Sequence, residues 1–257
     1  GTVHVGDERA YNFHPEVLPA LERAEGMAGE LTFDMAMMIQ AMSAMIMKDS
    51  TLADLLPEEK YNFVHKKIED RVGPLMTGMV EVMKPAIIPM MLIDPETLMS
   101  ADVTETQREP LDLYFQNKAR EAEKEVTGLE TVQEQMAAFE VYSLKEQAEM
   151  LYESLKAEEQ GGEEGSMEKE LNNLLDIYES EDLDSLYALT VSELDPMASE
   201  QLLNVRNIRM ADRFEKLMER KTWFVAVGAA HLPGEKGVIQ LMRDKGYTVK
   251  PLSEKKE

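Results

Sequence analysis

The sequence has no cysteine among its 257 residues, which removes three kinds of chemistry at once. Disulfide bonds, thiolate metal sites and cysteine nucleophiles are all excluded. The cellular compartment is not fixed by this absence, because proteins of oxidising and of reducing compartments can both lack cysteine. Long apolar runs are missing too, since none reaches the roughly 18 residues that a membrane-spanning helix needs.

Basic residues are scarce relative to acidic ones. The 27 Lys and Arg residues stand against 50 Asp and Glu residues, which gives a formal net charge of −23. Such a surface repels the phosphate backbone, so nucleic-acid binding is excluded as a function. The acidic residues are spread over helix-like stretches such as EAEKE (121–125), which is typical of a solvated helix face.

Several common catalytic motifs are also absent. The sequence contains no H-E-x-x-H helix, no phosphate-binding P-loop, no G-x-S-x-G elbow and no G-x-G-x-x-G after a strand. Zincin, nucleotide-binding and serine-hydrolase interpretations therefore have no support.

Short apolar segments bounded by glycine or polar residues predict five buried strands, at 1–5, 27–33, 124–130, 222–228 and 247–252. The stretch HPEVLPALERAEG predicts a helix after the first strand, and EKGVIQLMRDKG predicts one before the last. The expected fold class is α/β, with a mixed, mainly parallel sheet that is formed from both chain ends and carries a large helical insert.

We expect one domain over residues 1–257. Leu, Met and Ala recur at spacings of three and four from about 35 to 110 and from 131 to 220, which predicts helical insert regions. Residues 156–170 combine charge with three glycines, which predicts a mobile linker between two helices.

Two of the four histidines share one setting, a glycine three residues earlier, in GTVH (1–4) and GAAH (228–231). His4 closes the first predicted strand and His231 lies just beyond the fourth. The carboxyl ends of parallel strands meet at one edge of a sheet, where ligands bind, so both imidazoles are expected there. His14 and His65 have no such setting.

Acidic residues in or directly after apolar strands are candidates for the same edge. Glu30 lies within MAGELTF, and Glu130 ends KEVTGLE. A buried carboxylate needs a metal, a cation or a backbone donor, and Arg206, shortly before the fourth strand, is a candidate cation. Two neutral imidazoles with a carboxylate suit a divalent metal such as Mn, Co or Zn.

The 20 methionines concentrate in the helical regions, as in MAMMIQAMSAMIM. Such a stripe is typical of adaptable core packing, and it can also line an apolar groove. The alternative to an enzyme is thus a non-catalytic binding protein, which captures a hydrophobic peptide or partner through a Met-rich helical groove that includes Met37, Met38 and Met45.

Five regions resemble, in order, the TraB/GumN family, which includes the TIKI proteases. They are GTVHVGD, RAEGMAGELTF, VTGLETVQEQ with SLKEQ, RNIRMADRFEKL and the highly specific FVAVGAAHLPGEKGVIQLMRDKGYTVKPL. The resemblance implies an α/β domain with a helical insert and two Gly-x-x-His motifs. Ala230 stands where many members have glycine, a change that leaves the neighbouring histidine in place.

The resemblance further implies a divalent-metal-dependent peptidase that acts on a peptide or protein substrate. The TIKI members place these histidines and a glutamate at the active site. Carried over position by position, the metal ligands are His4, His231 and Glu30, and the catalytic candidates are Glu30, Glu130, Arg206 and Asn207.

Our leading hypothesis is therefore a metal-dependent hydrolase. His4 and His231 bind the metal with one of the two glutamates, the other glutamate acts as general base, and Arg206 stabilises the oxyanion or holds a carboxylate. Many family members are exported or lipid-anchored, so we expect a bacterial periplasmic or cell-surface protein whose targeting or anchoring segment precedes Gly1. Substrate, metal identity and oligomeric state stay open.

Overall fold

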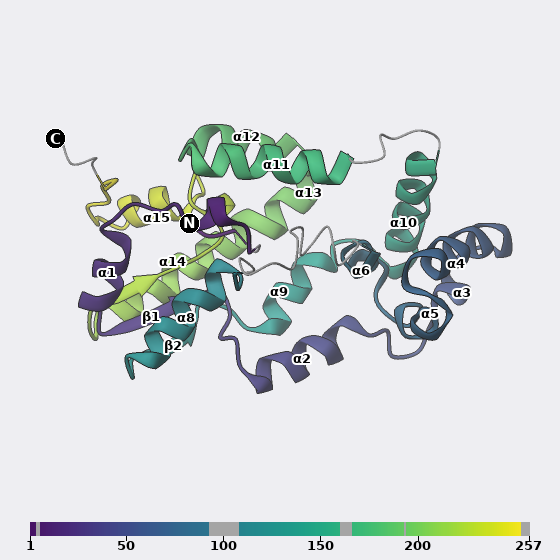
Figure 1. Ribbon diagram of the computed structural model, residues 1–257, viewed down its shortest axis with the longest axis horizontal. Coiled ribbons are helices and arrows are strands. Elements are labelled where there is room, and N and C mark those ends of the chain that lie inside the picture. The colour runs from purple at the N-terminus through teal and green to yellow at the C-terminus, as the bar shows by residue number, and fades with distance from the viewer. Residues whose placement is uncertain (4–5, 93–107, 160–165, 193, 253–257) are drawn as a thin grey trace.

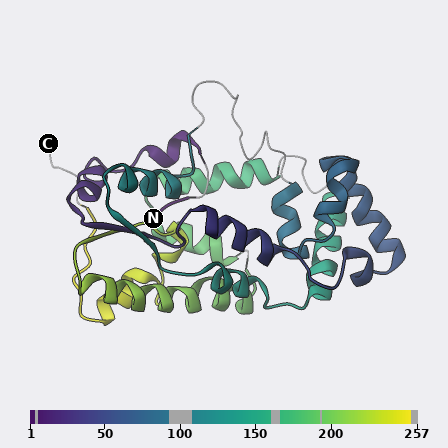
Figure 2. The ribbon, with the colours of Figure 1, turned by 90° about the horizontal axis from the view of Figure 1, so that it is seen from below.

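The computed structural model describes all residues except 4–5, 93–107, 160–165, 193 and 253–257. It is elongated, with a small α/β part at one end and an all-helical part at the other (Figures 1 and 2). The α/β fold class with a large helical part is confirmed.

A three-stranded parallel sheet forms the α/β part, with β1 (Gly26–Gly29) between β2 (Glu125–Gly128) and β3 (Trp223–Val225). Gly26 pairs with Glu125 on one side and with Trp223 on the other. The sheet thus joins segments from both chain ends to one strand from the middle, as predicted.

Helices cover both faces of this sheet. The helical elements of this part are η1 (Glu8–Tyr11), α1 (Val17–Arg23), α8 (Leu111–Glu121), α11 (Ser166–Glu179), α12 (Leu183–Ser192), α13 (Pro196–Ser199), the π-turn η3 (Glu200–Asn204), α14 (Val205–Met218), η4 (Ala229–His231) and α15 (Val238–Asp244). Successive residues of β1 point to opposite faces, so Met27 packs with α1 and α8, whereas Ala28 packs with α14 and α15.

The all-helical part has its own apolar core. Its elements are α2 (Met35–Met45), α3 (Leu52–Leu55), α4 (Glu58–Val72), α5 (Pro74–Val80), η2 (Pro85–Ile87), α6 (Ile88–Leu92), α9 (Val132–Phe139) and α10 (Leu144–Glu159). Val64 and Ile68 of α4 pack there against Ala148 and Leu151 of α10. Among the described residues, no helix is long and apolar enough to cross a membrane.

The prediction of a strand at 247–252 was wrong. These residues follow Gly246, which lies two residues after the end of α15 and has a φ of 93°. They form no regular element, and Val249 packs on the core. The edge beside the end of β3 is taken by the N-terminal residues, because Thr2 pairs there with Gly228. The predicted strand at 1–5 is thereby reduced to a single bridge at Thr2, and residues 4–5 lie outside the described part.

The stretch 156–170 was predicted to be a mobile linker between two helices. Helix α10 continues to Glu159 and α11 begins at Ser166, so both ends of that stretch are helical. The intervening residues 160–165 are outside the described part of the chain.

Candidate active site

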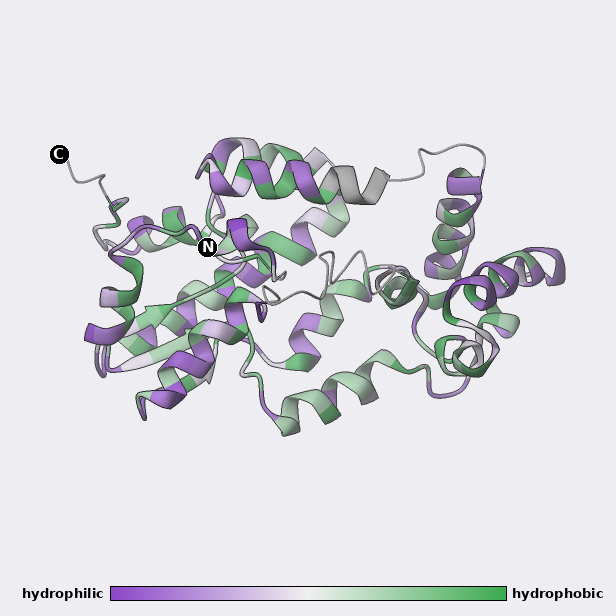
Figure 3. Cartoon of the chain, viewed as in Figure 1, coloured by the Kyte–Doolittle hydropathy of each residue, from purple (hydrophilic) through white to green (hydrophobic). Residues whose placement is uncertain are grey.

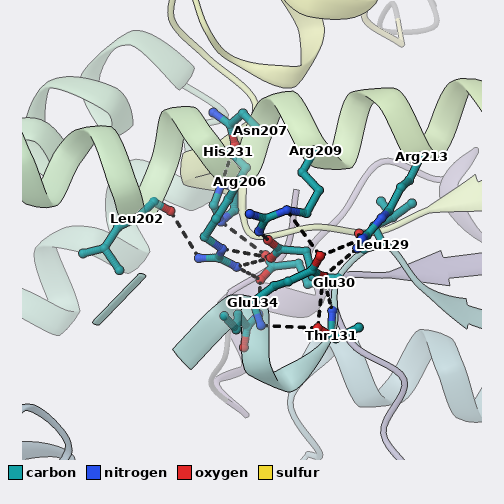
Figure 4. A network of polar contacts seen from close by, with 12 residues as sticks. Glu30, Leu129, Thr131, Glu134, Leu202, Arg206, Asn207, Arg209, Arg213 and His231 are labelled. Atoms are coloured by element: carbon teal, nitrogen blue, oxygen red, sulfur yellow. Dashed lines mark hydrogen bonds and ion pairs between the residues drawn. The ribbon is translucent and has the colours of Figure 1, made fainter. Parts of the chain in front are cut away.

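The carboxyl edge of the parallel sheet gathers the acidic candidates and one histidine. Glu30 directly follows β1, Glu130 follows β2, and His231 follows β3 after a short turn. Arg206 and Asn207, in the first turn of α14, lie over this edge (Figure 4). All five side chains belong to buried residues. His4, the remaining predicted ligand, lies outside the described residues.

The two Gly-x-x-His segments run side by side as far as the structure describes them. The Thr2 amide donates to the Val227 carbonyl at 2.8 Å, and the Ala229 amide donates to the Thr2 carbonyl at 2.8 Å. The buried Thr2 hydroxyl donates to Asp112 Oδ1 at 2.5 Å, which fixes this segment against α8. Two segments that lie some 230 residues apart in the sequence are thus joined by backbone hydrogen bonds.

Glu30 is held by donors on both carboxylate oxygens. Its Oε2 accepts from Arg206 Nη2 at 2.7 Å and from Gln135 Nε2 at 3.0 Å, and its Oε1 accepts from the Gly228 amide at 2.7 Å. These donors offset the cost of removing a carboxylate from water. They also fix the side chain with Oε1 toward the turn that carries His231.

Arg206 bridges the two glutamates. Its Nε donates to Glu130 Oε2 at 2.9 Å, and its Nη2 lies 2.8 Å from the same oxygen and 2.7 Å from Glu30 Oε2. Its third nitrogen, Nη1, donates to the Leu202 carbonyl in the π-turn at 3.2 Å. Arg209 Nη1 donates to the other oxygen of Glu130 at 3.1 Å. Both Glu130 oxygens are therefore paired with arginine.

His231 is oriented by Asn207. The Asn207 amide nitrogen donates to the Lys236 carbonyl at 2.9 Å, so its Oδ1 is the acceptor for His231 Nδ1 at 2.6 Å. With the proton on Nδ1, the lone pair of the neutral imidazole is on Nε2, which lies 3.6 Å from Glu30 Oε1.

A second ion pair extends the network along α14. Arg213 donates through both terminal nitrogens to Glu134 at 2.7 Å, and its Nη1 also donates to the Leu129 carbonyl at 2.9 Å. The bidentate contact stabilises the charged carboxylate and lowers the pKa of Glu134 to about 2. Glu134 also closes the capping box of α9 with Thr131, so the ion pair holds the helix that carries Gln135.

The chemistry of His231 and Glu30 fits a divalent metal. A metal-bound histidine typically donates its other ring N–H to a fixed acceptor, as His231 does to Asn207. Two ligands on one tetrahedral zinc lie roughly 3.4 Å apart, given metal–ligand bonds of about 2.1 Å. The 3.6 Å between His231 Nε2 and Glu30 Oε1 is close to this separation. Within the described residues, no group of three or more His, Asp or Glu side chains is arranged to hold a metal ion.

The contributors to the network that the sequence analysis missed include the Glu134–Arg213 pair and three groups that bind the two buried glutamates. Gln135 and the Gly228 amide bind Glu30, and Arg209 binds Glu130. Arg209 could have been recognised from the sequence, because Arg206, Arg209 and Arg213 are spaced by three and four residues and so share one helix face. The Gln135 contact depends on how α9 packs, which its sequence does not reveal.

Comparisons with known proteins bear on this cluster. The profile of the TraB/PrgY/gumN family matches residues 1–251. The chain is 24% identical over 302 residues to Metalloprotease TIKI2 of Danio rerio, covering 97% of this chain and 57% of that protein. It is also 24% identical over 297 residues to Metalloprotease TIKI1 of Danio rerio, covering 97% of this chain and 59% of that protein. Metalloprotease TIKI homolog of Amphimedon queenslandica is 35% identical over 78 residues, which are 29% of this chain and 14% of that protein. The chain thus spans less than two thirds of the length of these relatives. No solved structure matches it significantly.

Proposed function

The chain belongs to the TraB/PrgY/gumN family, and from this premise and the buried cluster we propose that it is a metal-dependent hydrolase, a peptidase that acts on peptide or protein substrates. The observation that carries the proposal is the placement of His231 Nε2 opposite Glu30 Oε1, with Nδ1 bound to Asn207. The names of the relatives, which are metalloproteases, support the same reaction class.

In this proposal His231 and Glu30 hold the metal together with His4. When bound, a divalent ion would acidify a water molecule at neutral pH and polarise the scissile carbonyl. Mn, Co and Zn all suit imidazole and carboxylate ligands, so the choice among them is left to experiment.

We assign to the remaining residues the role of holding other side chains of the site in place. Arg206 holds the carboxylates of Glu30 and Glu130 with its nitrogens, which favours this role over that of an oxyanion donor. Glu130 binds two arginines, so we assign it to placing Arg206 rather than to proton transfer. Asn207 fixes the His231 tautomer. Action outside the cytoplasm stays a prediction that rests on the family resemblance.

A binding role is the alternative, and one observation favours it: Met38 on α2 is exposed, and Met37 and Met45 are only partly covered. A non-catalytic protein that captures a hydrophobic peptide would use this helix. In that case the buried histidine only braces the turn between β3 and α15.

The deciding experiment compares His231→Ala with His14→Ala. His14 is a matched control, because its Nδ1 merely accepts from the Glu16 amide at the start of α1.

Chelator-treated protein is titrated with Mn, Co and Zn by calorimetry, and cleavage of a peptide library is followed with each metal. We expect metal binding and metal-stimulated cleavage in the wild type and in His14→Ala, and neither in folded His231→Ala. Equal binding and cleavage by both variants would overturn the assignment. Loss of peptide uptake in Met38→Glu, without any cleavage in the wild type, would support the alternative.

A further inference from the structure

A pocket lies where the α/β part and the all-helical part meet, and we call it the junction pocket. Its walls come from η2 and α6, from the end of α9 and the loop after it, from α10, and from α13 with the π-turn η3. Figure 3 shows α6 and the end of α9 nearest to it in green, hydrophobic shades. The volume of about 330 Å³ lies within the range of roughly 300–1,000 Å³ that is typical of ligand pockets.

The lining of the junction pocket suits an uncharged, apolar group. Most of the lining side chains are apolar, among them Phe139, Leu151 and Leu202. Among the described residues that line the pocket, Asp195 alone is charged, and its carboxylate accepts from the Tyr142 hydroxyl and from two amides at the start of α13. A charged or strongly polar ligand would lose its hydration there without gaining a partner of opposite charge, which costs free energy.

A buried glutamine holds the walls of the pocket in place. Gln147 on α10 is only 4% exposed, and its Oε1 accepts from the Ala86 amide at 3.3 Å. Its Nε2 donates to the Tyr142 carbonyl at 2.8 Å and to the Phe139 carbonyl at 3.3 Å. These bonds join η2, α10 and the segment that follows α9, so the pocket is formed before a ligand enters. A preformed pocket lowers the entropic cost of binding.

Helix α9 leads from the buried carboxylate cluster to the junction pocket. Gln135 donates to Glu30 Oε2 at 3.0 Å, and Ala138 and Phe139, three and four residues later, line the pocket. Residues at these spacings share a helix face and lie about one turn, or 5.4 Å, apart. One face of α9 therefore contacts the cluster at one turn and the pocket at the next.

The π-turn ahead of α14 makes the same connection from another side. Arg206 donates to Glu30, and its Nη1 also donates to the carbonyl of Leu202, four residues earlier. The Leu202 side chain lines the junction pocket, and Figure 4 shows it pointing away from the cluster. Since α9 and η3 pack together, the pocket lies about one helical turn from Glu30 along both elements. An extended peptide rises about 3.3–3.6 Å per residue, so it can reach both places within about three residues.

We propose that the junction pocket is a substrate subsite, which binds one large uncharged side chain, such as that of Phe, Leu or Met, within about three residues of the bond that is cleaved. This inference rests on the proposed peptidase function. It adds the substrate class: peptides with a large apolar residue close to the scissile bond.

A binding experiment without metal tests the pocket independently of cleavage. The chelator-treated full chain, with ¹³C-labelled methionine methyl groups, is titrated with N-acetyl-phenylalaninamide in the millimolar range and followed by NMR. Met150 lines the pocket and is 53% exposed, whereas Met35 on α2 is 70% exposed and serves as the reference. We expect the Met150 signal, assigned through Met150→Leu, to shift while the Met35 signal stays in place. The corresponding aspartate derivative should leave both signals unchanged.

Two neighbouring alanines supply a matched pair of variants. Ala138 lines the pocket and is buried, so Ala138→Leu fills it, whereas Ala137 on the same helix is exposed and outside the lining. We expect Ala138→Leu to weaken binding of the phenylalanine derivative by roughly 10-fold or more, and Ala137→Leu to leave it unchanged. Met150→Trp covers the pocket from its exposed side and gives a second blocking variant if Ala138→Leu does not fold.

Cleavage of a peptide library by the metal-loaded protein gives the second readout. We expect the wild type to prefer Phe, Leu or Met at one position near the cut, and Ala138→Leu to reduce that preference in kcat/KM by roughly 10-fold or more. Peptides with alanine at that position should be cleaved equally by both proteins.

The outcomes separate the subsite from the peptidase function. Cleavage with a preference that neither blocking variant changes would overturn the subsite and leave the peptidase proposal standing. Absence of cleavage with every metal would remove the peptidase proposal and the subsite with it, even where the Met150 signal shifts. A pocket that takes benzene but not N-acetyl-phenylalaninamide would bind a free apolar molecule rather than a peptide side chain, and would also overturn the subsite.

Discussion

Asn207 and His231 form a 2.6 Å contact between the amide oxygen and ring Nδ1, although the two residues come from a helix and a turn on either side of β3. The Asn207 amide nitrogen already donates to the Lys236 carbonyl, so Asn207 presents its amide oxygen, a hydrogen-bond acceptor, to the histidine ring. One asparagine therefore sets which nitrogen of the histidine faces Glu30.

Removing that acceptor should weaken metal binding. In Asn207→Leu, His231 loses the partner that fixes its tautomer and ring orientation, and the loss of such a contact typically costs 10–100-fold in metal affinity. Asn207→Asp keeps an acceptor at the same place and should retain most of the affinity. Calorimetric titration with Zn and Mn on both variants measures the difference. Equal affinities would show that His231 does not depend on Asn207.

Arg206→Met should strongly destabilise the fold. It leaves Glu30 and Glu130 buried without the cation between them. Removing one partner of a buried ion pair typically costs about 3–5 kcal/mol in the free energy of unfolding. Urea unfolding at pH 7 measures this loss. Adding Glu30→Gln to Arg206→Met should recover part of it, because it removes the buried charge that Arg206 no longer neutralises, whereas Glu130 keeps its contact with Arg209.

A surface arginine supplies the control for this comparison. Arg9 pairs with Asp7 and with the exposed Asp176, so Arg9→Met should cost less than about 1 kcal/mol. If Arg206→Met were no more destabilising than Arg9→Met, the bridging role of Arg206 would be wrong.

Acid should weaken the Glu134–Arg213 pair in a defined pH range. The folded pKa of Glu134 is lowered to about 2, against an ordinary value of 4.5. The pair therefore stabilises the fold fully above about pH 4.5, and its contribution is lost as the pH falls toward 2. Since Arg213 is partly exposed, we expect Glu134→Gln to lower the free energy of unfolding by about 1–2 kcal/mol at pH 7. Urea unfolding at pH 7 and pH 3 should show this difference shrinking. A difference that stays constant over that range would contradict it.

The convergence of three candidate side chains could be predicted from the sequence. Glu30, Glu130 and His231 each follow a strand, and parallel strands end at one edge, so their convergence follows from topology alone. Arg206 was named as a candidate cation because a buried carboxylate needs a metal, a cation or a backbone donor as its partner.

Pairing between distant segments could not be predicted in the same way. The segment 247–252 has the composition of a strand, but whether it pairs depends on which sheet edge is open, and Thr2 already pairs with Gly228 there. The contact of Gln135 with Glu30 likewise depends on how α9 packs. The π-turn ahead of Arg206, which presents the Leu202 carbonyl to the guanidinium, has no distinct sequence signal either.

Gly128 lies where the ends of β1 and β2 are packed so closely that no side chain fits without movement of the backbone. A Cβ at this position would lie 3.0 Å from the Glu130 carbonyl oxygen, 3.2 Å from the Glu30 carbonyl oxygen and 3.2 Å from the Thr32 amide nitrogen. These are backbone atoms, so Gly128→Ala must push the ends of β1 and β2 apart, and both glutamates move with them. We expect a loss of about 1–3 kcal/mol in the free energy of unfolding, together with weaker metal binding.

Gly78→Ala is the matched control, because Gly78 lies in α5 with no atom within 4 Å of an added Cβ, and alanine there should stabilise the helix by about 0.5–1 kcal/mol. Opposite signs for the two glycines in urea unfolding are therefore expected, and a Gly128→Ala protein as stable as Gly78→Ala would show that the strand ends can separate without cost.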